Sequence, residues 1–273
     1  MSSRFPSFLA AVLLLAPAPA QARELRVCAD PNNLPYSARD GSGFENRIAS
    51  VLAEELRADL RYVWAPQWRG FLRKTLNAGL CDLVVGVPVG LERVRTTRPY
   101  YTSTYVFVQR GDAVPIASFA DPALRSVRIG VHLVGDDGAN TPPVEELASR
   151  GIVAGVHGYM VYGDIAEPFP LAPIIAAVGN GDIDVAIVWG PSAAFFAARQ
   201  QPVLRATPVA DHDTAVPMAF AFAMGVRNGD DHLAAEVDRA IAARRSEIDA
   251  ILDAYHVPRP APSPALTTIG VEP

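Results

Sequence analysis

The chain has 273 residues, half of them hydrophobic, and a formal net charge of −5 at pH 7. This length suits one large domain or two smaller ones, and the apolar content is sufficient for a sizeable core. A weakly acidic chain without a basic run has no electrostatic footprint for nucleic acid, so that class of partner is excluded.

The N-terminus has the pattern of a secretory signal peptide. One positive charge at Arg4 precedes an apolar run over residues 8–16, and the small residues Ala20 and Ala22 give an A-x-A-like end. The apolar run is about half of the ~20 residues that a spanning helix needs, so a membrane anchor is the weaker alternative. We predict that residues 1–22 are removed and that the mature chain is exported to the periplasm.

Strands and helices then alternate, as in an α/β fold. The first helix has apolar residues at helical spacing, from Phe44 to Leu56. In chain order, we expect strands at residues 25–29, 60–63, 82–87, 103–109, 126–131, 153–157, 184–188 and 217–226. The helices are expected at residues 44–56, 68–78, 144–150, 172–179, 230–243 and 244–255.

The α/β pattern restarts after residue 109, which indicates a second lobe. We predict lobe 1 at residues 23–105 and 218–257 and lobe 2 at residues 106–217. The two crossings between them would form a hinge around a central cleft. Residues 258–273 are rich in proline and without periodicity, so we expect a disordered tail.

Cys28 and Cys81 are the two cysteines of the chain. Cys28 ends the first strand, and Cys81 directly precedes the strand at residues 82–87, which parallel pairing could bring alongside. In an oxidising compartment this arrangement favours a disulfide over two buried thiols. The CxxC spacing of a thioredoxin-like redox site is absent.

Several long segments resemble one family. They are ADPNNLPY (29–36), GFENRIA (43–49), RGFLRKTLNAGLCDLVVGVPVG (69–90), TTRPYYTSTYVFV (96–108), RIGVHLVGDDGANTPPVEELASRGI (128–152), GDIDVAIVWGPSAAFFA (181–197) and AMGVRNGDDHLAAEVDRAI (223–241). This pattern resembles the quinoprotein-dehydrogenase-associated substrate-binding proteins, the periplasmic "J" component encoded beside pyrroloquinoline-quinone (PQQ) methanol dehydrogenases. The resemblance implies a two-lobed type II periplasmic-binding-protein fold. It also implies a role near a PQQ-dependent methanol or related alcohol dehydrogenase and its cytochrome, and it names no ligand.

Amino-acid binders of the wider superfamily provide a position-by-position test of the ligand site. After their third strand they carry a hydroxyl-rich segment and an arginine for the ligand carboxylate. Here Pro88 replaces a hydroxyl, and Arg93 matches the arginine when counted from Gly86 but not when counted back from Pro99. Trp189 stands where those proteins place an aspartate for the ligand ammonium. A free amino acid is therefore a poor guess for the ligand.

Three loops carry the other candidate residues. In the loop after the first strand, the preference of Asp, Asn and Pro for turns explains these residues as well as ligand binding does. Trp68 either walls the cleft or packs in the core. The acidic loop, residues 135–141, precedes the helix expected at residue 144, and its paired aspartates would repel an anion. Thr141 is the predicted N-cap of that helix. A cation site of Asp136, Asp137 and Asp164 is a weaker alternative. The predicted ligand or partner cleft comprises Asp30, Asn32, Asn33, Tyr36, Trp68, Arg69, Pro88, Arg93, Asp136, Asp137, Asn140 and Trp189.

Catalytic signals are missing from the sequence. The histidines form no HxxxH pair and have no cysteine at zinc spacing, and Ser192 follows Trp-Gly-Pro rather than a nucleophile-elbow glycine pattern. We therefore predict a non-catalytic binding protein without cofactor or metal. The alternative is a solute receptor that delivers a small polar molecule to an ABC importer.

Overall fold

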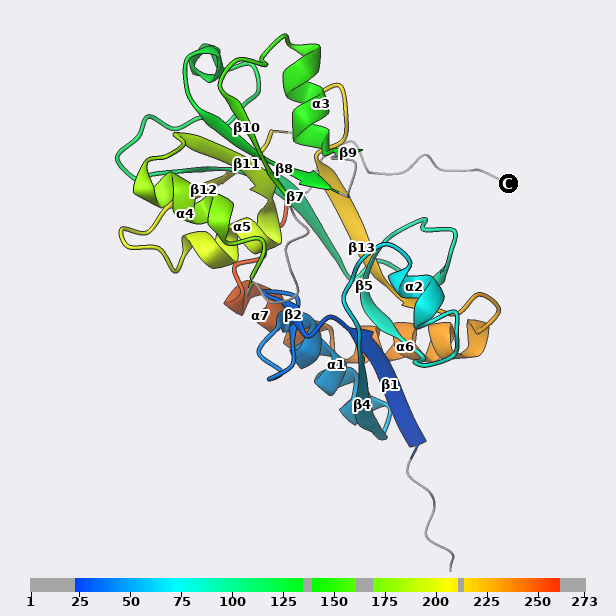
Figure 1. Cartoon of the computed structure of the whole chain (residues 1–273). Helices are drawn as coiled ribbons and strands as arrows, with labels where there is room; N and C mark the ends of the chain where they lie inside the picture. Colours follow the sequence, from blue (N-terminus) through cyan, green and yellow to red (C-terminus); the bar gives the residue numbers. More distant parts are fainter. Residues whose placement is uncertain (1–22, 135–138, 161–168, 211–213, 261–273) are drawn as a thin grey trace, which may run out of the picture.

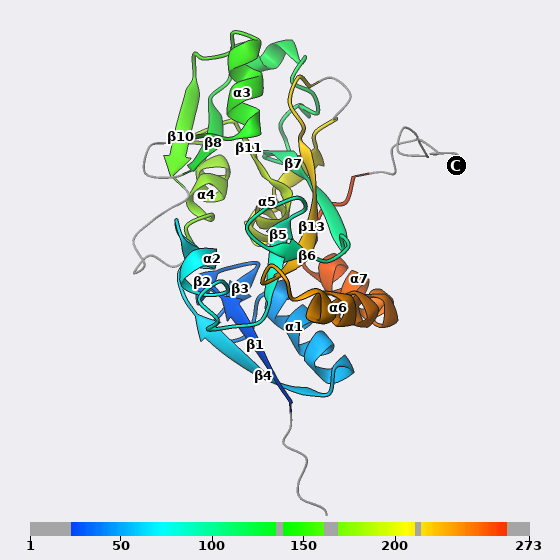
Figure 2. The same ribbon diagram turned by 90° about the vertical axis from the view of Figure 1, so that its right-hand side faces the viewer.

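The computed structural model describes residues 23–134, 139–160, 169–210 and 214–260. Two α/β bodies are joined by two long strands that run between them (Figures 1 and 2). The α/β fold class is thus confirmed. The predicted signal peptide at residues 1–22, together with Asp136, Asp137 and Asp164, lies outside the described residues.

In the first body, β1 (Arg23–Ala29) pairs in parallel with β4 (Ala58–Trp64), and α1 (Phe44–Glu55) connects them. The apolar stripe predicted for α1 is its core face, because Phe44, Ile48 and Leu52 are fully buried. On its other side β1 meets the segment that leads into β5 (Val84–Pro88), through a parallel bridge between Val27 and Leu83.

The helix expected at residues 68–78 is wrong in extent. Only α2 (Phe71–Lys74) is helical, and Trp68 lies in the loop before it. Gly70 has φ +86°, a left-handed conformation that separates Trp68 from the helix. After Lys74 the chain turns, and the amide of Leu80 donates to the carbonyl of Thr75. Short apolar stretches of this kind are compatible with helix or turn, and tertiary packing decided between them.

The two connecting strands are β7 (Tyr101–Gln109) and β13 (Ala219–Val226). They pair with each other in antiparallel fashion, from Tyr101 opposite Phe222 to Thr104 opposite Ala219. Beyond this shared region β7 continues alongside β11 (Val185–Trp189), while β13 continues alongside β5 and β6 (Arg95–Thr96). The pairing of β7 with β13 therefore joins the sheet of the second body to β5 and β6 of the first body.

The second body is built around β10 (Val156–Met160), β8 (Ile129–Val134), β11 and β7, in that order. Strands β12 (Arg205–Pro208) and β9 (Ala139–Asn140) flank this sheet. Its helices are α3 (Pro142–Ser149), α4 (Pro173–Asn180) and α5 (Gly190–Ala197). Helix α5 was not expected, because its sequence GPSAAFFA is small or apolar on every side and every residue is buried, so no amphipathic stripe marks it.

The two bodies repeat one salt-bridge arrangement. In the first, the Asp82 carboxylate accepts from the backbone amide, Nε and Nη2 of Arg26, at 3.2, 3.0 and 2.7 Å. In the second, Asp184 accepts from the same three groups of Arg128, at 2.8, 3.1 and 2.8 Å. Asp82 shortly precedes β5, Asp184 directly precedes β11, and each is 56 residues from its arginine. The shared geometry indicates two structurally related halves.

The chain ends on the first body, where α6 (Asp231–Ala243) and α7 (Arg245–Ala254) pack against α1. The next few residues differ from the expected tail. The carbonyl of Pro258 accepts a 2.6 Å hydrogen bond from Ser103 Oγ, and Arg259 pairs with Asp249 at 2.9 Å. Residues 258–260 thus pack on the folded body, and the rest of the predicted tail lies outside the described residues. None of the described helices has the length and apolarity that a bilayer span requires.

Candidate functional site

The predicted disulfide is confirmed. Cys28 and Cys81 are bonded, with their Cα atoms 5.6 Å apart, because the bridge between Val27 and Leu83 brings the two segments alongside. Both cysteines are buried in a small apolar cluster that includes Phe71, from α2. The disulfide therefore anchors α2 and β5, the two elements on which part of the candidate site is built.

The loop after β1 is tied to the loop before α2. The Asp30 carboxylate accepts hydrogen bonds from the amides of Asn32 (2.9 Å) and Gln67 (2.7 Å), and Asn33 Nδ2 donates to Gln67 Oε1 at 3.0 Å. The hairpin of β2 (Asn32–Asn33) and β3 (Ser37–Ala38) completes this loop. Asp30 and Asn33 thus perform the turn chemistry that the sequence left as an alternative to ligand binding.

A pocket of about 200 Å³ lies between residues 67–73 and residues 86–93. Three of the predicted cleft residues, Trp68, Pro88 and Arg93, line it together although up to 25 residues separate them in sequence. Trp68 is 45% exposed, so it is not a core residue. The structure therefore brings these three side chains to one open surface of the first body.

Trp189 lies in a separate aromatic cluster, where β11 ends and the two connecting strands cross. Its ring centroid is 5.3 Å from that of Tyr105, 5.5 Å from Phe222 and 5.9 Å from Phe220. All four rings are half-buried. Burial raises the pKa of Tyr105 to about 12, so its phenol stays neutral. The cluster offers stacking area and no fixed charge.

Tyr36 connects the first body to the second. Its ring packs on Phe44 at 5.4 Å, and its hydroxyl interacts with Ser192 at the start of α5. Burial raises the pKa of Tyr36 well above its ordinary range, an effect that the hydrogen bonds from Ser192 partly oppose. The Ser192 hydroxyl also lies 3.0 Å from the carbonyl oxygen of Trp189, to which it donates.

Sequence reasoning missed Glu45. Its carboxylate is half-buried, forms no hydrogen bond or ion pair with the described residues, and lies where a Cβ on Gly86 would collide with Oε1. Burial raises its pKa from 4.5 to about 8. The buried hydroxyls of Tyr100 and Tyr101 interact electrostatically with this carboxyl. They also have no hydrogen-bond partner among the described residues. In sequence, an acid in the first turn of a helix indicates only a favourable dipole interaction.

Of the acidic loop, residues 139–141 belong to the described part of the chain. Asn140 is exposed in β9, opposite Leu133, and lines neither the pocket nor the aromatic cluster. Thr141 is the N-cap of α3 as predicted, but its hydroxyl donates to the His132 carbonyl at 2.9 Å and caps no helix amide. In the described ranges, no three His, Cys, Asp or Glu side chains gather as a metal site.

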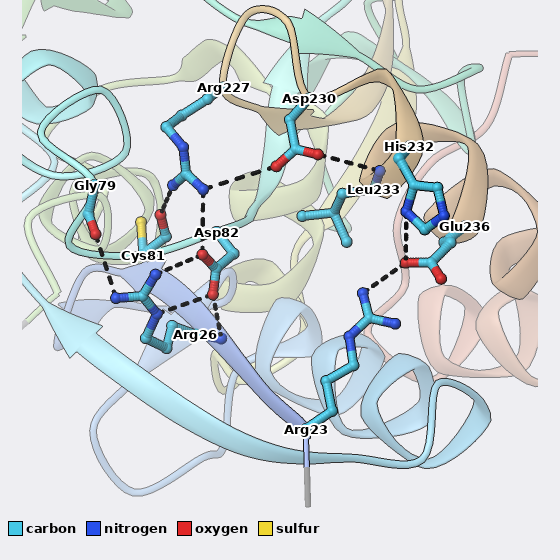
Figure 3. Close-up of polar contacts among 10 residues, drawn as sticks. All are labelled: Arg23, Arg26, Gly79, Cys81, Asp82, Arg227, Asp230, His232, Leu233 and Glu236. Atoms are coloured by element: carbon cyan, nitrogen blue, oxygen red, sulfur yellow. Dashed lines mark hydrogen bonds and ion pairs between the residues drawn. The ribbon is translucent and has the colours of Figure 1, made fainter.

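A second pocket, of about 360 Å³, opens beside the N-terminal end of β1, and Figure 3 shows the polar contacts of the charged side chains around it. Its charged groups are paired with one another. Arg26 holds Asp82, Arg227 reaches Asp82 at 3.4 Å and Asp230 at 3.7 Å, and Arg23 pairs with Glu236 at 2.5 Å. Such a network joins β1, the disulfide loop and α6, and its balanced charges favour a structural role.

Comparison with known proteins places the chain in a family. The model of "Bacterial extracellular solute-binding proteins, family 3" matches residues 25–258. Protein MoxJ of Methylorubrum extorquens (strain AM1) is 35% identical over 249 residues, which cover 86% of this chain and 81% of that one. Protein MoxJ of Paracoccus denitrificans is 31% identical over 272 residues, which cover 91% and 94%.

A crystal structure supports the same assignment. The periplasmic binding protein XoxJ from Methylobacterium extorquens AM1 superposes with a TM-score of 0.72 at 36% identity, over 87% of this chain and 99% of that chain. Matches of this length include both bodies and both connecting strands. The chain is therefore a member of the family 3 bacterial extracellular solute-binding proteins, and it is similar to the MoxJ proteins and to the periplasmic binding protein XoxJ.

Proposed function

We propose that this protein is a non-catalytic periplasmic binding protein that supports a PQQ-dependent methanol or related alcohol dehydrogenase. It would bind the enzyme, or a small molecule connected with its maturation. The observation that carries the proposal is the similarity to the MoxJ proteins and to XoxJ over nearly the whole chain, at 31–36% identity.

The proposed mechanism is closure of two lobes, residues 23–105 with 218–257 and residues 106–217. Because β7 of the second body pairs with β13 of the first, small backbone changes in these two strands would change the angle between the lobes. The Trp189 cluster and the contact of Tyr36 with Ser192 lie on this boundary. A partner that contacts both lobes would shift the population between open and closed states.

Two features disfavour an amino-acid receptor. Trp189 is packed among aromatic rings where an ammonium-binding carboxylate would be needed, and Pro88 provides no hydroxyl to the pocket that it lines. An indole supplies one hydrogen-bond donor and no negative charge. These features support the dehydrogenase-linked function over the importer-linked one.

The test is biolayer interferometry with immobilised mature protein, residues 23–273, against the PQQ alcohol dehydrogenase and the cytochrome from the same organism. The dehydrogenase is presented in apo and holo forms at low salt. We expect binding in the micromolar range or tighter, and Trp189→Ala should weaken it by roughly 2 kcal/mol if this ring is an interface anchor. Val114→Ala, which changes a valine that is 85% exposed, is the control. Failure of both proteins to bind at tens of micromolar would refute the proposal.

A further inference from the structure

Four basic side chains around the Trp68 pocket have no polar partner among the described residues. Arg69, Arg73, Lys74 and Arg93 are all exposed, and none forms an ion pair or side-chain hydrogen bond with any described residue. Other arginines, such as the half-buried Arg26 and the exposed Arg128, are held by aspartates. Around the second pocket, by contrast, the charged side chains are paired with one another, as Figure 3 shows.

These cations lie close to one another. Arg73 and Arg93 line the same pocket of about 200 Å³. The Arg73 Nη2 and the Lys74 Cε lie 3.3 and 3.7 Å from the position that a Cβ on Gly70 would take, so both side chains fold over this glycine. Arg69 is adjacent in the chain, next to the exposed Trp68. Like charges gathered in this way repel one another, so an anion placed among them would be favoured.

The surface also has the composition of an interface. Trp68 is 45% exposed and Val89 is 47% exposed, next to Pro88 on the pocket rim. Tryptophan and arginine are the residue types in which interface energy is most often concentrated. We define the cationic surface as Trp68, Arg69, Arg73, Lys74 and Arg93.

We propose that the cationic surface is a docking site for a protein partner that presents a carboxylate-rich segment, with an apolar side chain entering the pocket beside Trp68. Charge complementarity selects an acidic partner. A pocket of about 200 Å³ is smaller than the ~300–1,000 Å³ typical of small-molecule sites, and its cations point to solvent, which favours a protein surface over a free ligand. The partner's identity rests on the proposed function, whereas its acidic chemistry rests on this surface alone.

The first experiment compares the wild type with the triple variant Arg69→Gln, Arg73→Gln and Lys74→Gln against the dehydrogenase and the cytochrome. Arg57→Gln is the matched control, because Arg57 is also exposed and forms no ion pair with a described residue, but lies between α1 and β4. We expect the triple variant to lower the association rate about tenfold at low salt, with the difference shrinking as salt screens the charges. Equal rates for wild type and triple variant would overturn the docking proposal and leave the proposed function standing.

The second experiment does not depend on the dehydrogenase. A fluorescent peptide with alternating glutamate and leucine residues is titrated with each variant at low salt and followed by anisotropy. We expect the wild type and Arg57→Gln to bind alike and the triple variant to bind at least tenfold more weakly. Absence of binding, or equal binding by the triple variant, would overturn the proposal. Free glutarate that competes at the peptide's own affinity would also overturn it, because the surface would then be a small-anion site.

Discussion

The carboxylate of Glu45 lies against the backbone of Gly86, where α1 begins and β5 passes. Only a residue without a Cβ fits at position 86 while the Glu45 side chain keeps this position. Neither a base nor a hydrogen-bond donor of the described chain compensates for the partial loss of water around this carboxyl. The arrangement has a measurable consequence for the pH dependence of stability.

We predict that Glu45 lowers stability as pH rises. Because its native pKa is about 8 against 4.5 normally, the folded protein keeps the proton between these values while the unfolded chain loses it. Unfolding then releases a proton, so the free energy of unfolding falls with increasing pH over this range. Since the side chain is only half-buried, we expect about 1–2 kcal/mol between pH 5 and 8.

The measurement is urea denaturation of the wild type and Glu45→Gln at pH 5, 6, 7 and 8. The variant should gain stability relative to the wild type as pH rises, since glutamine carries no charge. Glu92→Gln, at an exposed position, should keep a constant difference from the wild type. A constant difference for Glu45→Gln as well would show that this carboxyl is ionised in the folded protein.

The disulfide should contribute a large part of the stability. In the chain-entropy model, a disulfide between residues that are 53 positions apart adds about 4 kcal/mol to the free energy of unfolding. The double variant Cys28→Ala/Cys81→Ala should lose about that amount in urea denaturation. Thiol titration of the unfolded, unreduced wild type should find no free cysteine, and two reactive thiols per chain would contradict the bond.

The Asp82 carboxylate should stabilise the folded protein at pH values above the native pKa of this group. Burial alone would raise that pKa, but hydrogen bonds from the Arg26 side chain and amide, with the charge of Arg26, hold it below 3.8. A lowered native pKa adds stability above the ordinary pKa, and this stability disappears as pH falls through the native value. Asp82→Asn should therefore cost about 2 kcal/mol at pH 7, with the difference narrowing below pH 4.

Asp184→Asn is a matched comparison for Asp82→Asn, because Arg128 holds Asp184 with the same three donors. The Asp184 side chain is 32% exposed against 17% for Asp82, so its replacement should cost less. Thermal melts of both variants at pH 7 and pH 3.5 measure the difference. An equal or larger cost for Asp184→Asn would mean that burial does not decide the strength of these pairs.

Free amino acids should leave the melting temperature unchanged. A ligand at 100 times its dissociation constant adds about 2.7 kcal/mol, which corresponds to a shift of several degrees in a chain of this size. We expect no shift with any common amino acid at millimolar concentration, because Trp189 stands in place of an ammonium-binding carboxylate and packs on aromatic rings. Micromolar binding of one of them would favour the ABC importer alternative.

The sequence alone determined the order of the major strands and helices. Apolar residues with a period of two or 3.6 must face a core, so the elements around α1, β7 and β13 were predicted near their observed bounds. It also predicted the disulfide, because the two cysteines of the chain lie beside strands that were expected to be neighbours. Local signals failed where periodicity was absent, at the short α2 and at the uniformly apolar α5.

Only the tertiary structure decided which candidate residues lie together. It placed Trp68, Pro88 and Arg93 in one pocket and Trp189 in a separate aromatic cluster, because the pairing of β5 and β11 with the connecting strands fixes where their ends point. It also decided which charged side chains form ion pairs, and that the carboxyl of Glu45 is partly removed from water. Desolvation and ion pairing depend on distances between segments that are far apart in the chain. Residue type and spacing in the sequence do not determine those distances.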